Sequence, residues 1–181
     1  SFPIRRGKEG TWKDWAAAAL ANALRERRVP RERVALSIDS GNALLAEIHT
    51  PFSEDDKIAK TIRFEMENHL PSHSIDDLVT DYSICEKSEK GALILGVALP
   101  RRTVRDHLDI LTVSDIDPLS IDLDIFAAVN ALIFAGLIPT QETTILVHGN
   151  AKYAKCVLIE NGRLRALRTS GDFDEYWQFH L

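Results

Sequence analysis

Residues 53–82 read SEDDKIAKTIRFEMENHLPSHSIDDLVTDY, and their pattern predicts a helix followed by a strand. Apolar residues recur along its first half at the spacing of one face of a helix, namely Ile58, Ile62, Met66 and Leu70. We expect the helix to begin with Ser53 as its N-cap, because acidic residues follow in the first turn. Pro71 ends it at Leu70. In the second half, apolar and polar residues alternate as they do along a strand, so we expect a strand over residues 78–85.

The neighbouring segments extend this unit on both sides. An apolar run over residues 44–49 predicts a strand before the helix, and another over residues 92–99 predicts a strand after it. The polar turn at residues 87–91 separates the last two strands. This strand–helix–strand–strand order predicts a small sheet with one helix on its face.

Further elements flank this unit. Helices are expected over residues 11–28, from residue 101 onward and over 125–135, and strands over 33–38, 119–123, 144–147, 154–159 and 164–168. Asn161-Gly162 predicts a two-residue hairpin between the last two strands. The helix over 125–135 is apolar almost all round, so we expect it to be buried. Residues 1–10 show no periodicity and are expected to be loose.

Composition excludes several classes of protein. The 181 residues carry a formal net charge of −5, which disfavours binding to nucleic acid or to an anionic membrane. No apolar run is long enough to cross a bilayer. The two cysteines, Cys85 and Cys156, lie far apart in strand-like runs, and we interpret them as buried thiols. The chain starts without methionine, so we expect it to be a segment of a longer protein.

Motifs for catalysis are missing from the sequence. It has no Gly-x-Ser-x-Gly elbow, no Walker A loop and no Gly-x-Gly-x-x-Gly. Asp117, Asp122 and Asp124 cluster around one strand, as in a two-metal site, but we favour the interpretation that Asp124 caps a helix and Asp122 faces solvent or a loop. Asp39 is interpreted as a turn former. We therefore predict no catalytic residue and no metal ligand.

Phe64 does not fit the apolar face of the helix. It falls on the opposite side, among Lys60, Glu67 and Asn68. A large aromatic side chain there needs a second surface to cover it. Two interpretations stay open: a neighbouring helix of the same chain, or a partner protein.

The stretch over residues 53–82 also resembles the signature region of the PilM family of pilus assembly proteins. The matching elements are an acidic-started helix with Phe64-Glu65, the stop Leu70-Pro71, the acidic pair Asp76-Asp77 and the strand pair Asp81-Tyr82, followed by Ala92–Pro100 and Pro118–Leu132. The resemblance covers roughly residues 15–170 and is one of pattern and order. It extends to the cytoplasmic domain of GspL, the related type II secretion protein.

This resemblance implies an α/β (α+β) fold, a fragment of the actin-like ATPase fold with ribonuclease-H-like lobes. Residues 11–41 and 117–143 would belong to the first lobe, residues 42–116 to an inserted strand–helix–strand–strand subdomain, and residues 144–181 to the start of the second lobe.

The same resemblance implies a scaffold of a type IV pilus or type II secretion machine at the cytoplasmic face of the inner membrane. Its expected partner is the PilN-like tail of a membrane assembly protein or a secretion ATPase. We expect the partner to contact the helix through Phe64, Glu65, Glu67 and Asn68.

Nucleotide chemistry is expected to be degenerate. The family holds phosphates with two hairpins, and this chain begins after the first of them. The second aligns with residues 144–162, where His148-Gly149-Asn150 replaces Asp-Ile-Gly. His148, Gly149, Asn150 and Lys152 are the candidate nucleotide-binding residues, and Lys155 is expected on a solvated hairpin face. We expect no ATP hydrolysis and no cofactor here. The alternative is a truncated actin-like ATPase or kinase that binds ATP and magnesium in its full-length form.

Overall fold

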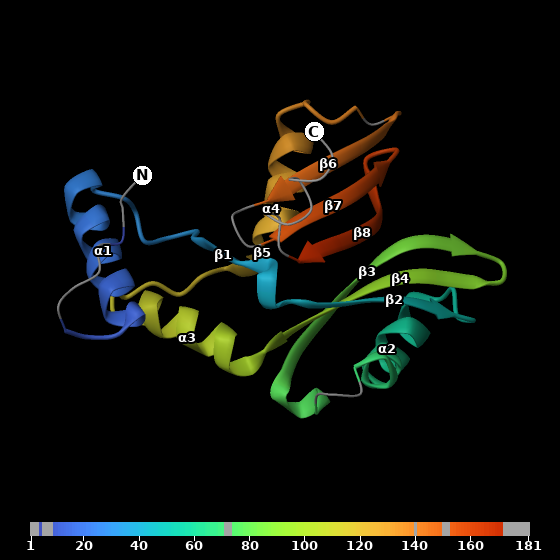
Figure 1. Cartoon of the computed structure of the whole chain (residues 1–181), viewed down its shortest axis with the longest axis horizontal. Coiled ribbons are helices and arrows are strands. Elements are labelled where there is room, and N and C mark those ends of the chain that lie inside the picture. Colours follow the sequence, from blue (N-terminus) through green and yellow to red (C-terminus); the bar gives the residue numbers. More distant parts are fainter. Residues whose placement is uncertain (1–3, 5–8, 71–73, 140, 150–152, 172–181) are drawn as a thin grey trace. The chain divides into compact units, whose positions relative to one another are not determined.

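The computed structural model of the chain describes residue 4 and residues 9–70, 74–139, 141–149 and 153–171 (Figure 1). Contacts between Cα atoms divide the chain into two compact units. The first consists of Ser1–Ile38 with Pro100–Leu123, and the second of Asp39–Leu99 with Asp124–Leu181. Most of the segment expected to be loose, residues 1–10, lies outside the described residues.

The first unit contains two helices and a parallel pair of strands. Its elements are α1 (Trp12–Arg27), β1 (Ala35–Ile38), α3 (Arg101–Thr112) and β5 (Ser120–Leu123). The register of β1 and β5 pairs Ile38 with Leu123. The two strands therefore lie side by side although 81 residues separate them in sequence, and their carboxyl ends coincide.

Helix α1 begins and docks through polar contacts. Thr11 is the N-cap of α1, and the Asp14 carboxylate accepts hydrogen bonds from the Thr11 backbone N–H at 2.7 Å and from the Thr11 hydroxyl at 2.8 Å. Lys13 Nζ reaches α3, where it lies 2.8 Å from Asp106 and 3.3 Å from Asp109. These bonds join α1 to α3.

The second unit opens with the predicted strand–helix–strand–strand layer. Its elements are β2 (Leu44–Thr50), α2 (Asp55–His69), β3 (Leu78–Ser88) and β4 (Gly91–Pro100), with short 3-10 helices η1 (Ser40–Asn42) and η2 (Ile75–Asp77). The strand order is β2-β4-β3, and β2 runs antiparallel to β4. The sequence-based prediction of one helix on a small sheet is confirmed.

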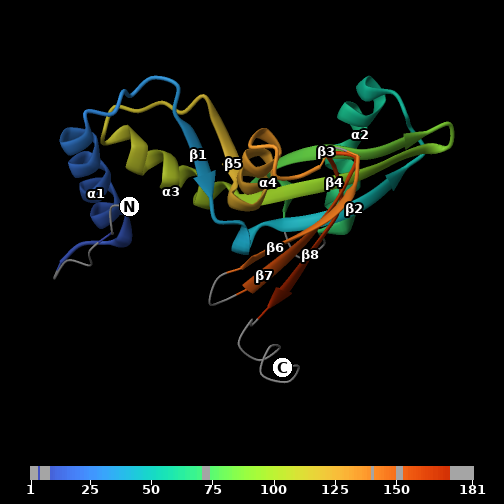
Figure 2. The ribbon, with the colours of Figure 1, turned by 90° about the horizontal axis from the view of Figure 1, so that it is seen from above.

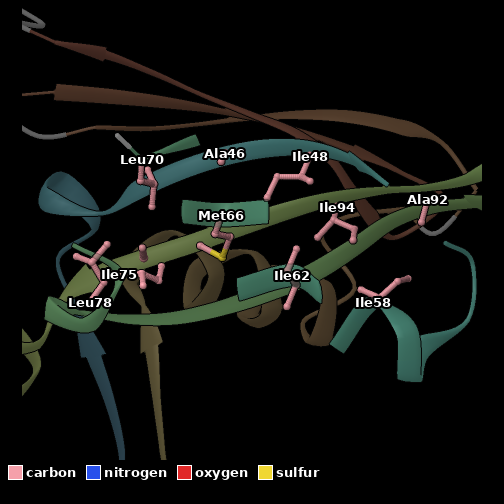
Figure 3. Packing of buried hydrophobic residues seen from close by; sticks show 11 residues of the cluster. Ala46, Ile48, Ile58, Ile62, Met66, Leu70, Ile75, Leu78, Ala92 and Ile94 are labelled. Carbon is pink, nitrogen blue, oxygen red and sulfur yellow. The ribbon is translucent and has the colours of Figure 1, made fainter. Parts of the chain in front are cut away.

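The core of this layer lies between α2 and the sheet (Figure 3). The predicted apolar face of α2 is buried as expected, with Ile58 at 0% and Met66 at 1% exposure. It packs against sheet residues such as Ile48 and Ile94, and Leu78 closes the cluster next to η2. Burying side chains of this size contributes about 1.5–3 kcal/mol each.

The start of α2 differs from the prediction. Its N-cap is Glu54 instead of Ser53, and no side-chain hydrogen bond caps it. The Glu54 carbonyl accepts from the backbone N–H groups of Lys57 and Ile58. Ion pairs hold the first turn instead, from Lys57 to Glu54 at 2.8 Å and from Lys87 on β3 to Asp55 at 2.6 Å.

The rest of the second unit is helix α4 (Asp124–Phe134) and the strands β6 (Thr143–Gly149), β7 (Tyr153–Glu160) and β8 (Arg163–Gly171). These three strands form one antiparallel sheet in chain order, as Figure 2 shows. Asn161 and Gly162 both have positive φ, 52° and 70°, which confirms the predicted hairpin turn.

The prediction that α4 is buried all round is wrong for the chain described here. Ile125 and Val129 are buried, but Phe134 is 95% exposed at the last turn. An apolar composition predicts burial only where other elements cover every face of the helix, and the described residues cover one face.

The contacts also group α3 with α1, whereas the predicted boundaries assign residues 101–116 to the inserted subdomain. The assignment of segments to lobes stays a prediction. None of the described helices combines the length and the hydropathy that a transmembrane span requires.

Candidate functional site

The outer side of α2 carries an uncovered aromatic ring. Phe64 is 65% exposed, while its neighbours Ile62 and Met66 face the core at 7% and 1%. Among the described residues, no helix covers Phe64. The interpretation that a neighbouring helix of this chain buries it is therefore not supported, and the interpretation that a partner covers it stays open.

The structure brings most of the predicted partner-binding residues together. Glu67 and Asn68 are exposed one turn beyond Phe64, and Lys60 lies one turn before it. We call these four residues the outer face of α2. Glu65 lies beside this face and is half-buried, and its backbone carbonyl is 2.8 Å from His69 Nδ1.

The predicted nucleotide-binding residues are described only in part. His148 and Gly149 end β6, while Asn150 and Lys152 lie outside the described residues. His148 Nε2 lies 3.4 Å from Asp124 Oδ2, so this imidazole faces a carboxylate of its own chain.

Lys155 differs most from its prediction. It was expected on a solvated hairpin face, but its side chain is only 1% exposed. Strand alternation explains the difference, because Lys155 shares its face of β7 with the buried residues Tyr153, Val157 and Ile159.

A polar cluster surrounds Lys155. Asp39 directly follows β1 and Asp124 directly follows β5, and the last residues of these two strands are paired. Asp39 directly precedes η1, and Asp124 is the first residue of α4. Asp39 caps η1 by accepting from the Gly41 backbone N–H at 2.6 Å. Asp124 is the first residue of α4, and its Oδ1 accepts from the Ile125 N–H at 2.7 Å. The predicted turn role of Asp39 is confirmed. Asp124, predicted to cap this helix, is instead its first residue.

The two carboxylates are linked through Tyr153 and Ser40. The Tyr153 hydroxyl donates to Asp39 Oδ1 at 2.5 Å and lies 3.3 Å from Asp124 Oδ2. Ser40 donates to Asp124 Oδ1 from its backbone N–H at 3.1 Å and from its hydroxyl. Lys155 Nζ donates to the Ser40 carbonyl at 2.6 Å and lies 5.4 Å from the centre of the Tyr153 ring. We call Asp39, Ser40, Asp124, Tyr153 and Lys155 the Lys155 cluster.

Hydrogen bonds in the cluster favour the ionised form of Asp124. Burial alone would raise the pKa of Asp124, but the hydrogen bonds from Ser40 and Ile125 outweigh burial and hold that pKa below its usual value. Burial and the hydrogen bond to Asp39 raise the pKa of Tyr153. The phenol therefore stays a neutral donor next to the ionised Asp124 carboxylate.

Sequence reasoning did not place Tyr153 or Lys155 in a site. The sequence feature that could have revealed them is the alternation of side chains along β7, which puts Tyr153 and Lys155 on the apolar face of the strand. Within the part of the chain that the structure describes, no group of three or more histidine, cysteine or acidic residues is arranged to hold a metal ion. The cluster offers hydrogen bonding and charge.

Comparison with known proteins gives a result only at the level of structure. No family model matches the sequence. No curated protein matches it either.

Several solved structures share the fold. A chain of the PilM-PilN type IV pilus biogenesis complex aligns with a TM-score of 0.75 and 17% identity, over 93% of this chain and 51% of that one. EpsL, an inner membrane component of the type II secretion system of Vibrio cholerae, aligns through its cytoplasmic domain with a TM-score of 0.55 and 14% identity, over 86% of this chain and 56% of that one. A Bacteroides thetaiotaomicron protein of unknown function, described as having an actin-like ATPase fold, aligns at 0.48 with 11% identity, over 90% of this chain and 58% of that one.

The chain thus spans about half the length of the solved structures that it matches. At these identities the likeness establishes the fold alone. The chain has the fold shared by the PilM-PilN structure and the cytoplasmic domain of EpsL, which confirms the prediction of a PilM/GspL-like fold.

Proposed function

We propose that this chain is a non-catalytic scaffold component of a type IV pilus or type II secretion machine, which binds partner proteins at the cytoplasmic face of the inner membrane. The fold supports this proposal, because both higher-scoring structures come from such machines. Fold alone does not decide function, so binding requires a suitable surface on this chain.

The observation that carries the proposal is the exposure of Phe64. An aromatic ring that is 65% exposed on an otherwise polar helix side leaves apolar area in water. Aromatic residues are enriched among the anchors that supply most of the energy in protein interfaces. Phe64 is therefore a suitable anchor, and the buried opposite side of α2 holds it on a rigid element.

The partner should present an apolar pocket or side chain to Phe64 and polar groups around it. The outer face of α2 offers one cation, Lys60, one turn before Phe64 and one carboxylate, Glu67, about one turn after it. A short segment with a central apolar residue and opposite charges on either side matches this pattern. We propose that the segment belongs to a PilN-like cytoplasmic tail of a membrane assembly protein, or to a secretion ATPase.

We also propose that the chain neither hydrolyses ATP nor needs a cofactor. The arrangement of His148 supports this, because its imidazole lies against Asp124. Asp124 in turn accepts hydrogen bonds from Ser40 and Ile125, so its carboxylate is already engaged within the chain.

The test is a titration of the chain with synthetic cytoplasmic tails of membrane assembly proteins, followed by isothermal calorimetry. We expect one tail to bind the wild type and to bind Phe64→Ala at least tenfold more weakly. Val79→Ala is a matched control, because Val79 is also an exposed apolar residue, at 40%, but lies on β3. Equal weakening by both substitutions would contradict the assignment to α2.

A second titration, with ATP and magnesium, addresses the proposal on catalysis. Submicromolar binding accompanied by release of phosphate would overturn the non-catalytic assignment. It would leave the result of the tail titration unaffected, so the two parts of the proposal fail separately.

A further inference from the structure

Strand β6 forms a free edge of its three-stranded sheet. The strand order is β6-β7-β8, so β6 and β8 are the two edges (Figure 1). Ion pairs engage the β8 edge, because Arg165 and Arg168 reach carboxylates of β3 and β2. Among the described residues, no strand pairs with the outer side of β6. The backbone N–H and C=O groups on that side are therefore open to another strand.

The residues of β6 leave this edge unprotected. Proteins usually block an edge strand with lysine, with proline or with a bulge. Residues 143–149 read TTILVHG, without proline, lysine, arginine or an acidic residue. All seven residues pair in unbroken register with β7, so no bulge bends the strand. The opposite edge strand, β8, contains Arg163, Arg165 and Arg168.

Apolar side chains line one face of β6. Ile145 is 64% exposed and Val147 is 58% exposed, and both point to the same face because one residue separates them. Their partners on β7 are Leu158 and Cys156, which extend this face away from the edge. An added strand would bond to the free backbone groups and cover these side chains, as in recognition by strand addition.

The sequence of β6 is complementary to itself. In an antiparallel pair of two copies centred on Leu146, Ile145 of each copy lies opposite Val147 of the other. A two-fold axis makes the two halves of such an interface identical. No pair in this register joins like charges, since the remaining pairs are Thr144 with His148 and Thr143 with Gly149.

We propose that β6 is the site at which two copies of this chain associate, through an antiparallel β6–β6 pair that joins their sheets into one continuous sheet. The second copy is the occupant that this edge fits, because symmetry alone places apolar residues opposite apolar residues. A single strand pair is smaller than a standard interface, so we expect a dissociation constant on the order of 10⁻⁵–10⁻⁴ M. This inference goes beyond the proposed scaffold function and does not involve the outer face of α2.

The test is analytical ultracentrifugation of the chain over a range of about 1 µM to 1 mM, which spans the expected dissociation constant. We expect the mean mass to rise from that of one chain toward that of two. Val147→Lys should weaken association at least about tenfold, because it sets an ammonium group against Ile145 of the other copy. Leu137→Lys is the matched control, since Leu137 is 68% exposed but lies outside β6, and it should leave association unchanged. Equal weakening by both substitutions would overturn the proposal.

A pair of substitutions tests the register. Ile145→Glu alone should also weaken association, because it sets a carboxylate against Val147 of the other copy. Ile145→Glu combined with Val147→Lys places a carboxylate of each copy opposite an ammonium group of the other, if the pair is centred on Leu146. We expect the double variant to associate more tightly than either single variant. A double variant that associates no better than both would overturn this pairing.

Hydrogen exchange of the wild type needs no substitution and identifies what covers the edge. The amides of β6 that point away from β7 should exchange quickly in dilute solution and more slowly at about 1 mM, where the pair forms. Protection of these amides in a dilute monomer would mean that another segment of the same chain covers β6, and would overturn the proposal. So would a wild type that stays monomeric at about 1 mM. Neither outcome changes the tail titration with Phe64→Ala, so this inference and the proposed function fail separately.

Discussion

The hydroxyl of Tyr153 donates a 2.5 Å hydrogen bond to Asp39 Oδ1 across 114 residues of sequence. Asp39 is the N-cap of η1, and Tyr153 is the first residue of β7. The same hydroxyl lies 3.3 Å from Asp124, so one phenol joins the starts of three elements. Each of these residues has an ordinary local role, as a cap, a helix start or a strand residue, and the cluster exists only because the fold brings them together.

The first prediction concerns this bond. Tyr153→Phe should lower the free energy of unfolding by about 1.5–3 kcal/mol, because a hydrogen bond to a charged group is lost. Because the pKa of Tyr153 is raised in the folded state, the protonated phenol stabilises the folded state fully below pH 10, the usual pKa of tyrosine. This stabilisation is lost as pH rises through the pKa that Tyr153 has in the folded state. Urea unfolding of both proteins at pH 7 and at pH 11 measures the difference, which should be smaller at pH 11. A stability unchanged by Tyr153→Phe at pH 7 would contradict the bond.

The second prediction separates the two sides of α2. Phe64→Ala should change the free energy of unfolding by less than about 1 kcal/mol, because the ring is 65% exposed. Met66→Ala on the core side should cost about 2–5 kcal/mol. Thermal or urea unfolding of the two variants gives both values. A cost for Phe64→Ala as large as that for Met66→Ala would mean that the ring is part of a core.

The third prediction concerns the two thiols, which were both predicted to be buried. Cys85 is 5% exposed, but Cys156 is exposed, so the prediction is confirmed for the first and wrong for the second. Burial also raises the pKa of the Cys85 thiol, which lowers its thiolate fraction. Labelling with an aromatic disulfide reagent at pH 8 should therefore modify Cys156 at least tenfold faster. Cys156→Ser should remove the fast phase, and a fast phase that persists in this variant would refute the assignment.

The fourth prediction uses two glycines with positive φ. Gly91 has φ of 132°, and a Cβ there would lie 2.0 Å from the Thr50 carbonyl oxygen. Gly136 has φ of 70°, and apart from its neighbours in the chain no atom lies within 4 Å of the position that a Cβ would take. Gly91→Ala should cost more than about 3 kcal/mol, since strain and a backbone clash add, whereas Gly136→Ala should cost about 1 kcal/mol. Equal values in urea unfolding would show that the β2–β4 contact at Gly91 is looser than described.

The fifth prediction concerns the ion pair between Glu47 on β2 and Arg168 on β8. Two hydrogen bonds join Arg168 to Glu47, and the one from Arg168 Nη2 to Glu47 Oε2 measures 3.0 Å. These hydrogen bonds lower the pKa of Glu47. Stability from this pair is therefore present above pH 4.5 and is lost as pH falls through the lowered value. Because Arg168 is 68% exposed, we expect Arg168→Gln to cost less than about 1 kcal/mol at pH 7 and nothing at pH 3. A larger cost at pH 3 than at pH 7 would contradict this sign.

Local patterns were sufficient for the secondary structure. Helix α2 and its buried face follow from the spacing of Ile58, Ile62 and Met66, and the last hairpin follows from Asn161-Gly162. These features depend on residues that are close in sequence, where periodicity and turn preference act directly. The sequence also identified Phe64 as the residue out of pattern on α2, which the structure shows to be exposed.

Only the tertiary structure decided which polar residues meet and which apolar residues stay exposed. Nothing local links Asp39, Asp124 and Lys155, because their proximity depends on the pairing of β1 with β5 and on the alternation of β7. In the same way, the composition of α4 predicted a buried helix, yet Phe134 is 95% exposed. Sequence determines what each element prefers, whereas burial and charge balance depend on what the rest of the fold places against it.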